Sequence, residues 1–184
     1  RAKFAAEKGA NVLVSIHINS YGKGYTSAHG AEVYYPNSNY NSTVSGQGQN
    51  LSAVILKQLT ALGLADRGIK IRNSKDGETY PDGSLADYLG INKYAKLYGY
   101  PGILIEHAYA NNVSDAANYL TTDAQLQRLG VADATGIAQY FGLQKKKNVS
   151  LYGICKQETV EGISAALSYS SDDSNIKFRW MEYN

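Results

Sequence analysis

Apolar segments with the composition of buried strands recur along the first part of the chain, and polar or glycine-containing turns follow them. Residues 12–18 (VLVSIHI) come directly after a short helical segment and a glycine turn, an order typical of α/β sheets. β-Branched and aromatic residues predict further strands at 31–35 (AEVYY), 68–71 (GIKI) and 103–105 (ILI). The pattern therefore predicts at least three buried strands.

Segments with helical periodicity lie between these strands. Leu51, Ile55 and Leu59 fall on one face of a helix predicted over 51–62. Residues 37–48, which are rich in Asn, Ser and Gly, are expected to form a polar loop. Further helices are predicted at 1–8, 92–98, 114–120 and 122–141.

The last of these helices has clear signals at both ends. Thr122 and Gln125 form a capping-box pattern at its start, and Gly142 would end it. Residues 1–143 are thus predicted to form an α/β domain, in which a mostly parallel layered sheet is flanked by helices.

The pattern changes after this domain. Residues 144–148 (QKKKN) have the composition of a linker. Residues 149–184 then contain segments in which apolar and polar residues alternate, at 149–155, 162–170 and 176–183. Alternation of this kind is typical of antiparallel strands. It predicts the start of an all-β, immunoglobulin-like accessory module that is cut off at Asn184.

Composition narrows the classes of partner. The formal net charge is +2 and the basic residues are scattered apart from 145–147 (KKK), so nucleic-acid binding is not expected. The sequence has no run of 18 apolar residues and predicts no membrane span. Cys155 is the single cysteine, so no disulfide can form within the chain. The 16 Tyr residues suit either contact with a polar polymer, such as a glycan or peptide, or a tyrosine-rich surface without a ligand.

Two residues that could carry chemistry end predicted strands. His17 and Glu106 each precede a loop, and ligand sites of open α/β sheets lie beyond the carboxyl ends of the strands. If the two strands are parallel neighbours, both side chains face one cleft. A neutral imidazole suits zinc, and a nearby carboxylate suits a general base that acts on water. The alternative is a core histidine bonded to backbone and a Glu106 paired with Lys or Arg, and spacing alone favours that alternative.

Several motifs occur in a recognisable order. They are SIHINS at 15–20, GAEVYY at 30–35, GLADRGIKI at 63–71, PGILIEHAYANNVSD at 101–115 and GIAQYFG at 136–142. This series resembles the zinc-dependent N-acetylmuramoyl-L-alanine amidases of the amidase-3 family, and the resemblance covers residues 1–143.

The resemblance implies a bacterial peptidoglycan hydrolase that uses Zn²⁺. His17, in the pattern S-x-H-x-N, corresponds to a zinc ligand of the family, and Glu106 corresponds to its general base acting on zinc-activated water. The bond cut would be the amide that joins N-acetylmuramic acid to L-alanine of the stem peptide. The protein would be secreted and act at the cell wall, with a signal peptide in a segment before Arg1.

The chain departs from the family in its metal ligands. The family takes two further zinc ligands, a His and a Glu, from segments that would precede Arg1, and a catalytic zinc site needs three protein ligands. His29 is expected to be exposed in a glycine-rich loop, and strand alternation should point His107 away from Glu106. The chain is therefore expected to be an N-terminally truncated catalytic domain that binds zinc poorly and is inactive alone.

Two other functions remain open. One is a catalytically inactive cell-wall binding protein of the same fold. The other is a different zinc amide hydrolase, such as a carboxypeptidase, although that class does not predict the SIHINS and DRGIK segments.

Three lesser residues carry alternative interpretations. Arg67 is expected to pair with Asp66 as a structural ion pair, although it could contact substrate. Asn112 is expected to cap the helix that starts near Ser114. Tyr109 could pack either against a bound sugar or peptide or against the core.

Overall fold

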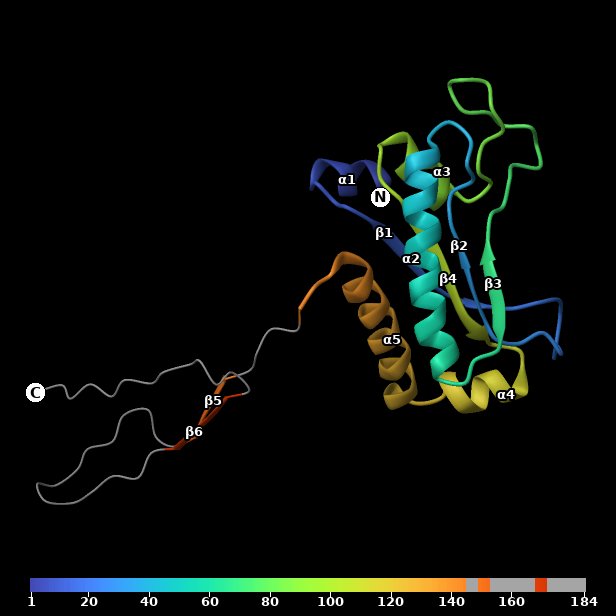
Figure 1. Ribbon diagram of the computed structural model, residues 1–184. Coiled ribbons are helices and arrows are strands. Elements are labelled where there is room, and N and C mark those ends of the chain that lie inside the picture. The colour runs from blue at the N-terminus through green and yellow to red at the C-terminus, as the bar shows by residue number, and fades with distance from the viewer. Residues whose placement is uncertain (145–148, 153–167, 172–184) are drawn as a thin grey trace, which may run out of the picture. The chain divides into compact units, whose positions relative to one another are not determined.

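The computed structural model describes residues 1–144, 149–152 and 168–171. The chain divides into two compact units, Arg1–Leu143 and Gln144–Asn184. The first unit contains a four-stranded sheet with helices on both faces (Figure 1). Its elements are α1 (Ala2–Glu7), β1 (Leu13–Asn19), β2 (Ala31–Tyr34), α2 (Ser42–Ala61), β3 (Asp66–Lys70), α3 (Gly90–Leu97), β4 (Gly102–Tyr109), α4 (Val113–Asp115), a π-helical turn η1 (Ala116–Leu120) and α5 (Asp123–Phe141).

The strand order is β1-β4-β2-β3. β1 runs parallel to β4, β2 runs parallel to β3, and β2 runs antiparallel to β4. Two of the three pairings are therefore parallel, which confirms the predicted class of a mostly parallel α/β sheet flanked by helices.

In the second unit, β5 (Val149–Tyr152) pairs antiparallel with β6 (Ser168–Ser171). Both strands overlap segments that the alternating pattern predicts to be strands. The strand predicted at 176–183, the linker residues 145–148 and the rest of the predicted immunoglobulin-like module lie outside the described residues.

β4 separates two layers of packing. Ile103 and Ile105 are fully buried in the main core, to which α2 and α5 contribute. On the other face, Gly102 allows α3 to approach the sheet. A Cβ at this position would lie 2.2 Å from the carbonyl oxygen of Ile91 and 2.7 Å from Cβ of Ala95, so a larger residue would displace α3.

β4 is longer than predicted. It continues past Ile105 through Glu106 to Tyr109 and does not break into a loop after the apolar run. Its parallel pairing with β1 persists as far as Asn19, with a shift in register after His17. Backbone pairing therefore extends the strand beyond its apolar residues.

α2 begins at Ser42, within the segment predicted to be a polar loop, so that prediction was wrong there. The side chain of Asn41 accepts a hydrogen bond from the backbone N of Val44 at 3.1 Å and caps the helix. A Cβ at Gly48 would lie 2.8 Å from Cδ of Pro36. The small and polar residues that indicated a loop thus allow close packing and capping in the first turns of a helix.

α5 begins and ends where the sequence predicts. The Thr122–Gln125 capping box is formed, and Gly142 ends the helix in a left-handed conformation with φ of 63°. α5 packs tightly on α2, since a Cβ at Gly136 would lie 2.8 Å from Cα of Ile55.

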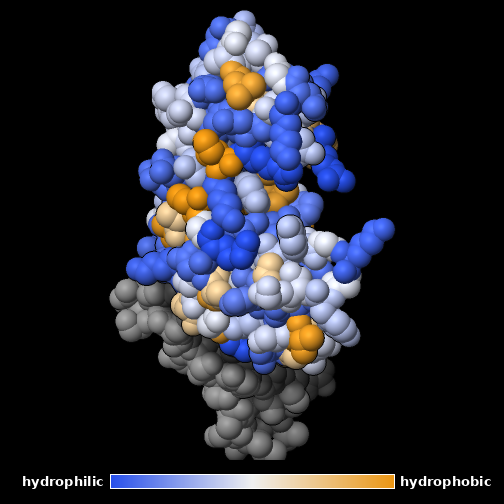
Figure 2. Space-filling model, turned by 90° about the vertical axis from the view of Figure 1, so that its right-hand side faces the viewer, coloured by the Kyte–Doolittle hydropathy of each residue, from blue (hydrophilic) through white to orange (hydrophobic). Residues whose placement is uncertain are grey.

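The side of the molecule that faces right in Figure 1 is mostly hydrophilic (Figure 2). Hydrophobic residues of the described part of the chain are scattered over it as small separate spots. None of the helices in the described ranges is long and apolar enough to cross a membrane.

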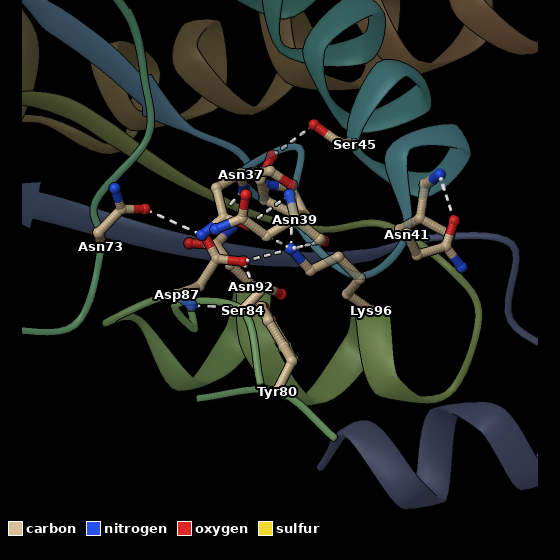
Figure 3. A network of polar contacts seen from close by, with 12 residues as sticks. Asn37, Asn39, Asn41, Ser45, Asn73, Tyr80, Ser84, Asp87, Asn92 and Lys96 are labelled. Atoms are coloured by element: carbon tan, nitrogen blue, oxygen red, sulfur yellow. Dashed lines mark hydrogen bonds and ion pairs between the residues drawn. The ribbon is translucent and has the colours of Figure 1, made fainter. Parts of the chain in front are cut away.

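A buried polar network links α3 to the loop between β3 and α3 (Figure 3). Lys96 is fully buried, and its Nζ lies 2.9 Å from Oδ2 of Asp87. The same Nζ donates to the backbone carbonyls of Asn37 and Asn39 at 2.9 and 3.0 Å. Asp87 also accepts from the hydroxyl of Tyr80 at 2.5 Å and from the backbone N of Asn37 at 2.8 Å. Burial lowers the pKa of Lys96, although Asp87 opposes the shift.

Replacing Lys96 with Met is expected to lower the free energy of unfolding by about 3–5 kcal/mol, because Asp87 would stay buried without its cation. Urea denaturation measures this difference. The matched control is Lys57→Met on the exposed side of α2, expected to change stability by no more than about 0.5 kcal/mol. A Lys96→Met protein as stable as the control would contradict the importance given to this pair.

A second buried ion pair joins β4 to α5. Nε2 of His107 donates to Oδ2 of Asp133 at 2.8 Å, and Nδ1 donates to the backbone carbonyl of His17 at 3.0 Å. Both ring nitrogens face acceptors, so the surroundings favour the doubly protonated ring. Burial opposes this charge, but the bonds to Asp133 and to the carbonyl of His17 outweigh it and raise the pKa of His107.

Because the pKa of His107 is raised by folding, the stability from this pair is fully present below the unfolded value of about 6.5 and is lost as pH rises through the folded pKa. Asp133→Asn is expected to lower the free energy of unfolding by about 1.5–3 kcal/mol at pH 5.5, with a smaller loss at pH 9. Urea denaturation of both proteins across this pH range tests the sign. The exposed Asp76→Asn serves as control, and a loss from Asp133→Asn that stays constant with pH would refute the assignment.

Candidate active site

His17 and Glu106 lie side by side on neighbouring strands. β1 and β4 run parallel, and the Cα of His17 pairs with the Cα of Glu106. The two strands end at the same edge of the sheet (Figure 1). His107 points into the core, so Glu106 and its partner project from the opposite face by strand alternation. The structure therefore brings together the two residues that the sequence singles out.

Glu106 is half-buried and incompletely bonded. Its Oε2 is buried and has no hydrogen-bond partner among the described residues, and none of the ion pairs found there includes it. Within the described residues, Glu106 therefore does not form the ion pair with Lys or Arg that was the alternative prediction. Burial raises the pKa of Glu106 to about 6, the charge of Glu32 adds to the rise, and His107 opposes it. Such a carboxylate is suited to accept a proton near neutral pH.

The ring of His17 is exposed, so this residue is not a core histidine. Its Nε2 lies 2.8 Å from Oγ of Ser15, two residues earlier on the strand. Nδ1 has no hydrogen-bond partner within the described residues. A surface imidazole with a free nitrogen can coordinate a metal ion.

Glu32 lies on the other side of Glu106. It belongs to β2, and its Cα pairs with the Cα of Glu106 across the antiparallel strands. The side chain is only 4% exposed. Its Oε1 accepts from Nδ2 of Asn19 at 3.2 Å and from the hydroxyl of Tyr34 at 2.9 Å. The face of the sheet that carries Glu106 thus holds a second carboxylate, that of Glu32, which is fully hydrogen-bonded.

Two cations from β3 complete the bonding of Glu32. Nε of Arg67 lies 2.9 Å from Oε2, and Nζ of Lys70 contacts the same oxygen. Burial works against the charge of Glu32, but the bonds from Lys70, Tyr34 and Arg67 together lower its pKa. Glu32 therefore stays ionised beside Glu106.

A β-bulge places both cations on one face. Residues three apart point to opposite faces in a regular strand, but the register between β2 and β3 shifts after Asp66. Gly68 has φ of 85° within this shift, and its backbone N donates to Oδ1 of Asp66 at 2.8 Å. Asp66 thus stabilises the bulge, and the predicted Asp66–Arg67 ion pair was wrong because Arg67 bonds to Glu32.

Glu32 and Lys70 are not among the site residues predicted from the sequence. The available signal was a glutamate between the apolar Ala31 and Val33 of a predicted strand, which alternation places on the face opposite to theirs. Tyr109, for which two interpretations were open, is buried, and the guanidinium carbon of Arg67 lies 5.0 Å from its ring centroid.

Hydrogen bonds link the loop after β1 to the loop after β4. The side chain of Asn111 donates to the backbone carbonyls of Tyr21 and Gly24 at 2.8 and 2.6 Å. Asn112 accepts from the backbone N of Asp115 at 3.0 Å, which confirms its predicted role as a helix cap. These bonds order the chain at the edge of the sheet where His17 and Glu106 lie.

The described residues contain no group of three or more His, Cys, Asp or Glu side chains that could hold a metal ion. His29 is exposed, with Nδ1 at 2.9 Å from the carbonyl of Ser27, and His107 is bonded to Asp133. Neither joins His17, as the sequence led us to expect. His17 and Glu106 fit one ligand and the base of a zinc site, but the described part of the chain does not supply the three ligands that such a site needs.

Solved structures share this fold. Cwp6 from Clostridium difficile is 27% identical, with a TM-score of 0.60 over 76% of this chain and 19% of that chain. The catalytic domain of CwlV, an N-acetylmuramoyl-L-alanine amidase from Bacillus (Paenibacillus) polymyxa var. colistinus, is 27% identical, with a TM-score of 0.55 over 78% of this chain and 64% of that chain. Ami1, the N-acetylmuramyl-L-alanine amidase from Mycobacterium smegmatis, is 24% identical with a TM-score of 0.54 over 77% and 58%, and shows the fold alone.

The chain spans less than two thirds of the length of each of these structures. A comparison with curated protein sequences gives no match. The family model Amidase_3, described as N-acetylmuramoyl-L-alanine amidase, matches residues 1–139, which include all four strands of the sheet and both His17 and Glu106. The chain therefore belongs to the Amidase_3 family of N-acetylmuramoyl-L-alanine amidases.

Proposed function

We propose that this protein is a peptidoglycan hydrolase that cleaves the amide between N-acetylmuramic acid and L-alanine of the stem peptide. The observation that carries the proposal is Glu106, a half-buried carboxylate whose buried Oε2 has no hydrogen-bond partner among the described residues, in register with the exposed His17. Membership of the Amidase_3 family supports the reaction class, and the likeness to CwlV supports it at 27% identity.

Glu106 acts as the general base in this proposal. It takes a proton from the attacking water and passes it to the amine of L-alanine as the amide breaks. A pKa of about 6 keeps Glu106 mostly ionised at neutral pH while leaving its conjugate acid strong enough to protonate the leaving amine. Glu32, on the same face, keeps its own charge through its four donors and raises the pKa of Glu106.

Zn²⁺, when bound, would polarise the amide carbonyl and lower the pKa of water. His17 would hold the ion through the ring nitrogen that has no partner among the described residues. We propose that the full ligand set includes residues beyond the described part of this chain, because a catalytic zinc site needs three. The proposed place of action is the bacterial cell wall, after secretion.

Replacing Glu106 with Gln is expected to reduce the release of stem peptides from purified peptidoglycan by a factor of about 10²–10⁴, because the amide cannot take the proton. Bound zinc should stay nearly unchanged. Both quantities are measured on the full-length protein. The control is Glu7→Gln on the exposed surface of α1, which should leave turnover intact.

Turnover that persists in Glu106→Gln would show that another group is the base. If the unmodified zinc-loaded protein binds peptidoglycan and releases no peptide, it is a wall-binding protein of the same fold. Release of free amino acids from peptide ends, with no free stem peptide, would indicate a carboxypeptidase.

Replacing His17 with Ala is expected to lower the amount of zinc that co-purifies with the full-length protein, because one ligand is removed. Metal content is measured by elemental analysis after dialysis. The exposed His29, whose Nδ1 bonds to a backbone carbonyl, provides the control His29→Ala. Equal zinc content in both variants would exclude His17 from the ligand set.

A further inference from the structure

The cluster formed by Glu32, Arg67 and Lys70 carries more positive than negative charge. One carboxylate faces two cations, and both cations contact the same oxygen, Oε2. Neither cation pairs with a second acidic side chain among the described residues. The cluster therefore has a net charge of about +1 when all three groups are ionised.

Glu32 does not need both cations to satisfy its own hydrogen bonds. Its other oxygen already accepts from Nδ2 of Asn19 and from the hydroxyl of Tyr34. One cation on Oε2 would complete an ion pair with good bonding. The second cation is thus beyond what this buried carboxylate requires.

The cations reach the surface although the carboxylate does not. The side chains of Arg67 and Lys70 are 32% and 34% exposed, whereas that of Glu32 is 4% exposed. Arg67 uses Nε for Glu32, and its terminal guanidinium nitrogens have no hydrogen-bond partner among the described residues. A guanidinium with free nitrogens suits a carboxylate, which accepts two parallel hydrogen bonds.

The backbone departs from regular pairing to produce this arrangement. The bulge at Gly68 turns Arg67 and Lys70 to one face, and Asp66 stabilises the bulge through the backbone N of Gly68. Bulges are known to redirect side chains next to functional sites. Without this change of register, only one of the two cations would lie on the face of the sheet that carries Glu32 and Glu106.

The distance between Glu106 and the two cations limits which part of the substrate the cations could bind. Glu106 lies on β4, Glu32 on the adjacent β2 and the cations on β3, which is two strands from β4. Two strand spacings amount to about 10 Å. An extended peptide covers this distance in about three residues. A group bound by the cations would therefore belong to the first residues of the peptide that follows the cleaved amide.

We propose that Arg67 and Lys70 form a subsite that binds a carboxylate of the stem peptide, within about three residues of the bond that is cut. The inference rests on the proposed function, because it places the amide at Glu106. It goes further by assigning a specificity-determining contact to the bulged edge of the sheet. The ligand class is a peptide with a free carboxylate near its muramyl end.

The test uses two muramyl tripeptides that differ only in their carboxyl groups: those of the second and third residues are free carboxylates in one and carboxamides in the other. Binding to the full-length protein with Glu106→Gln, which prevents turnover, is measured by titration calorimetry. The carboxylate form is expected to bind about tenfold more tightly, because an ion pair with free donors is lost in the amide. Raising the salt concentration should reduce this preference.

Substitutions of Arg67 and Lys70 test whether these residues cause the preference for the carboxylate ligand. Lys70→Met and Arg67→Lys should each reduce the ratio of affinities to about threefold or less, whereas Lys57→Met, on α2, should keep it. Since loss of a cation beside buried Glu32 could unfold a variant, circular dichroism accompanies each titration. The comparison of the two ligands on the protein with native Arg67 and Lys70 needs no such variant.

Equal affinity for the two ligands, or binding of neither, overturns the subsite. A preference that survives in both folded variants overturns it as well. These outcomes differ from failure of the proposed function, in which the unmodified protein releases no stem peptide from peptidoglycan. Release with no difference between carboxylate and carboxamide would leave the amidase function standing and refute the subsite alone.

Discussion

The register of three strands determines where the groups of the site lie. His17 on β1, Glu106 on β4 and Glu32 on β2 form one row across the sheet, because each is paired with its neighbour in the ladder. Strands lie about 4.8 Å apart, so backbone hydrogen bonds set the spacing of the three side chains. A slip of one residue in either pairing would turn one of them to the core face. The site therefore depends on strand pairing before it depends on any side-chain contact.

Charge compensation distinguishes Glu106 from the other carboxylates inside this domain. Glu32 and Asp87 bond to cations, Asp133 bonds to the His107 imidazolium, and buried Asp115 accepts from backbone N–H groups. Desolvating a charge costs free energy that such partners offset. Among the described residues, Oδ1 of Asp133 and Oε2 of Glu106 are both buried without a hydrogen-bond partner, but only Glu106 also lacks a cation, and its pKa rises accordingly. A group left in this state is stabilised only when a proton, water or ligand arrives, which is the condition that proton transfer requires.

The sequence alone predicted His17 and Glu106 as site residues, but it did not predict the cluster of Glu32, Arg67 and Lys70 beside them. Alternation and the apolar run before Glu106 were enough to place it on the face opposite to His107. The strand order, in which an antiparallel β2 lies between β4 and β3, could not be deduced from local pattern. The contact of Arg67 with Glu32 depends on a bulge, because a period of two would place Arg67 on the same face as Ile69, which packs against the core. The start of α2 was missed because capping and close packing favour the same small residues as loops do.

Contacts on the core face of the sheet also fix the position of His17 on the opposite face. β1 is an outer strand, and Ile16 and Ile18, which flank His17, are 66% and 42% exposed, so side-chain packing gives this part of the strand little support. Its position depends on backbone pairing with β4 and on the bond from His107 to the carbonyl of His17. His107 is in turn fixed by Asp133 on α5. The orientation of the proposed metal ligand is thus set from the opposite face of the sheet, by a buried charged pair, and a change in that pair would act on His17 through the backbone.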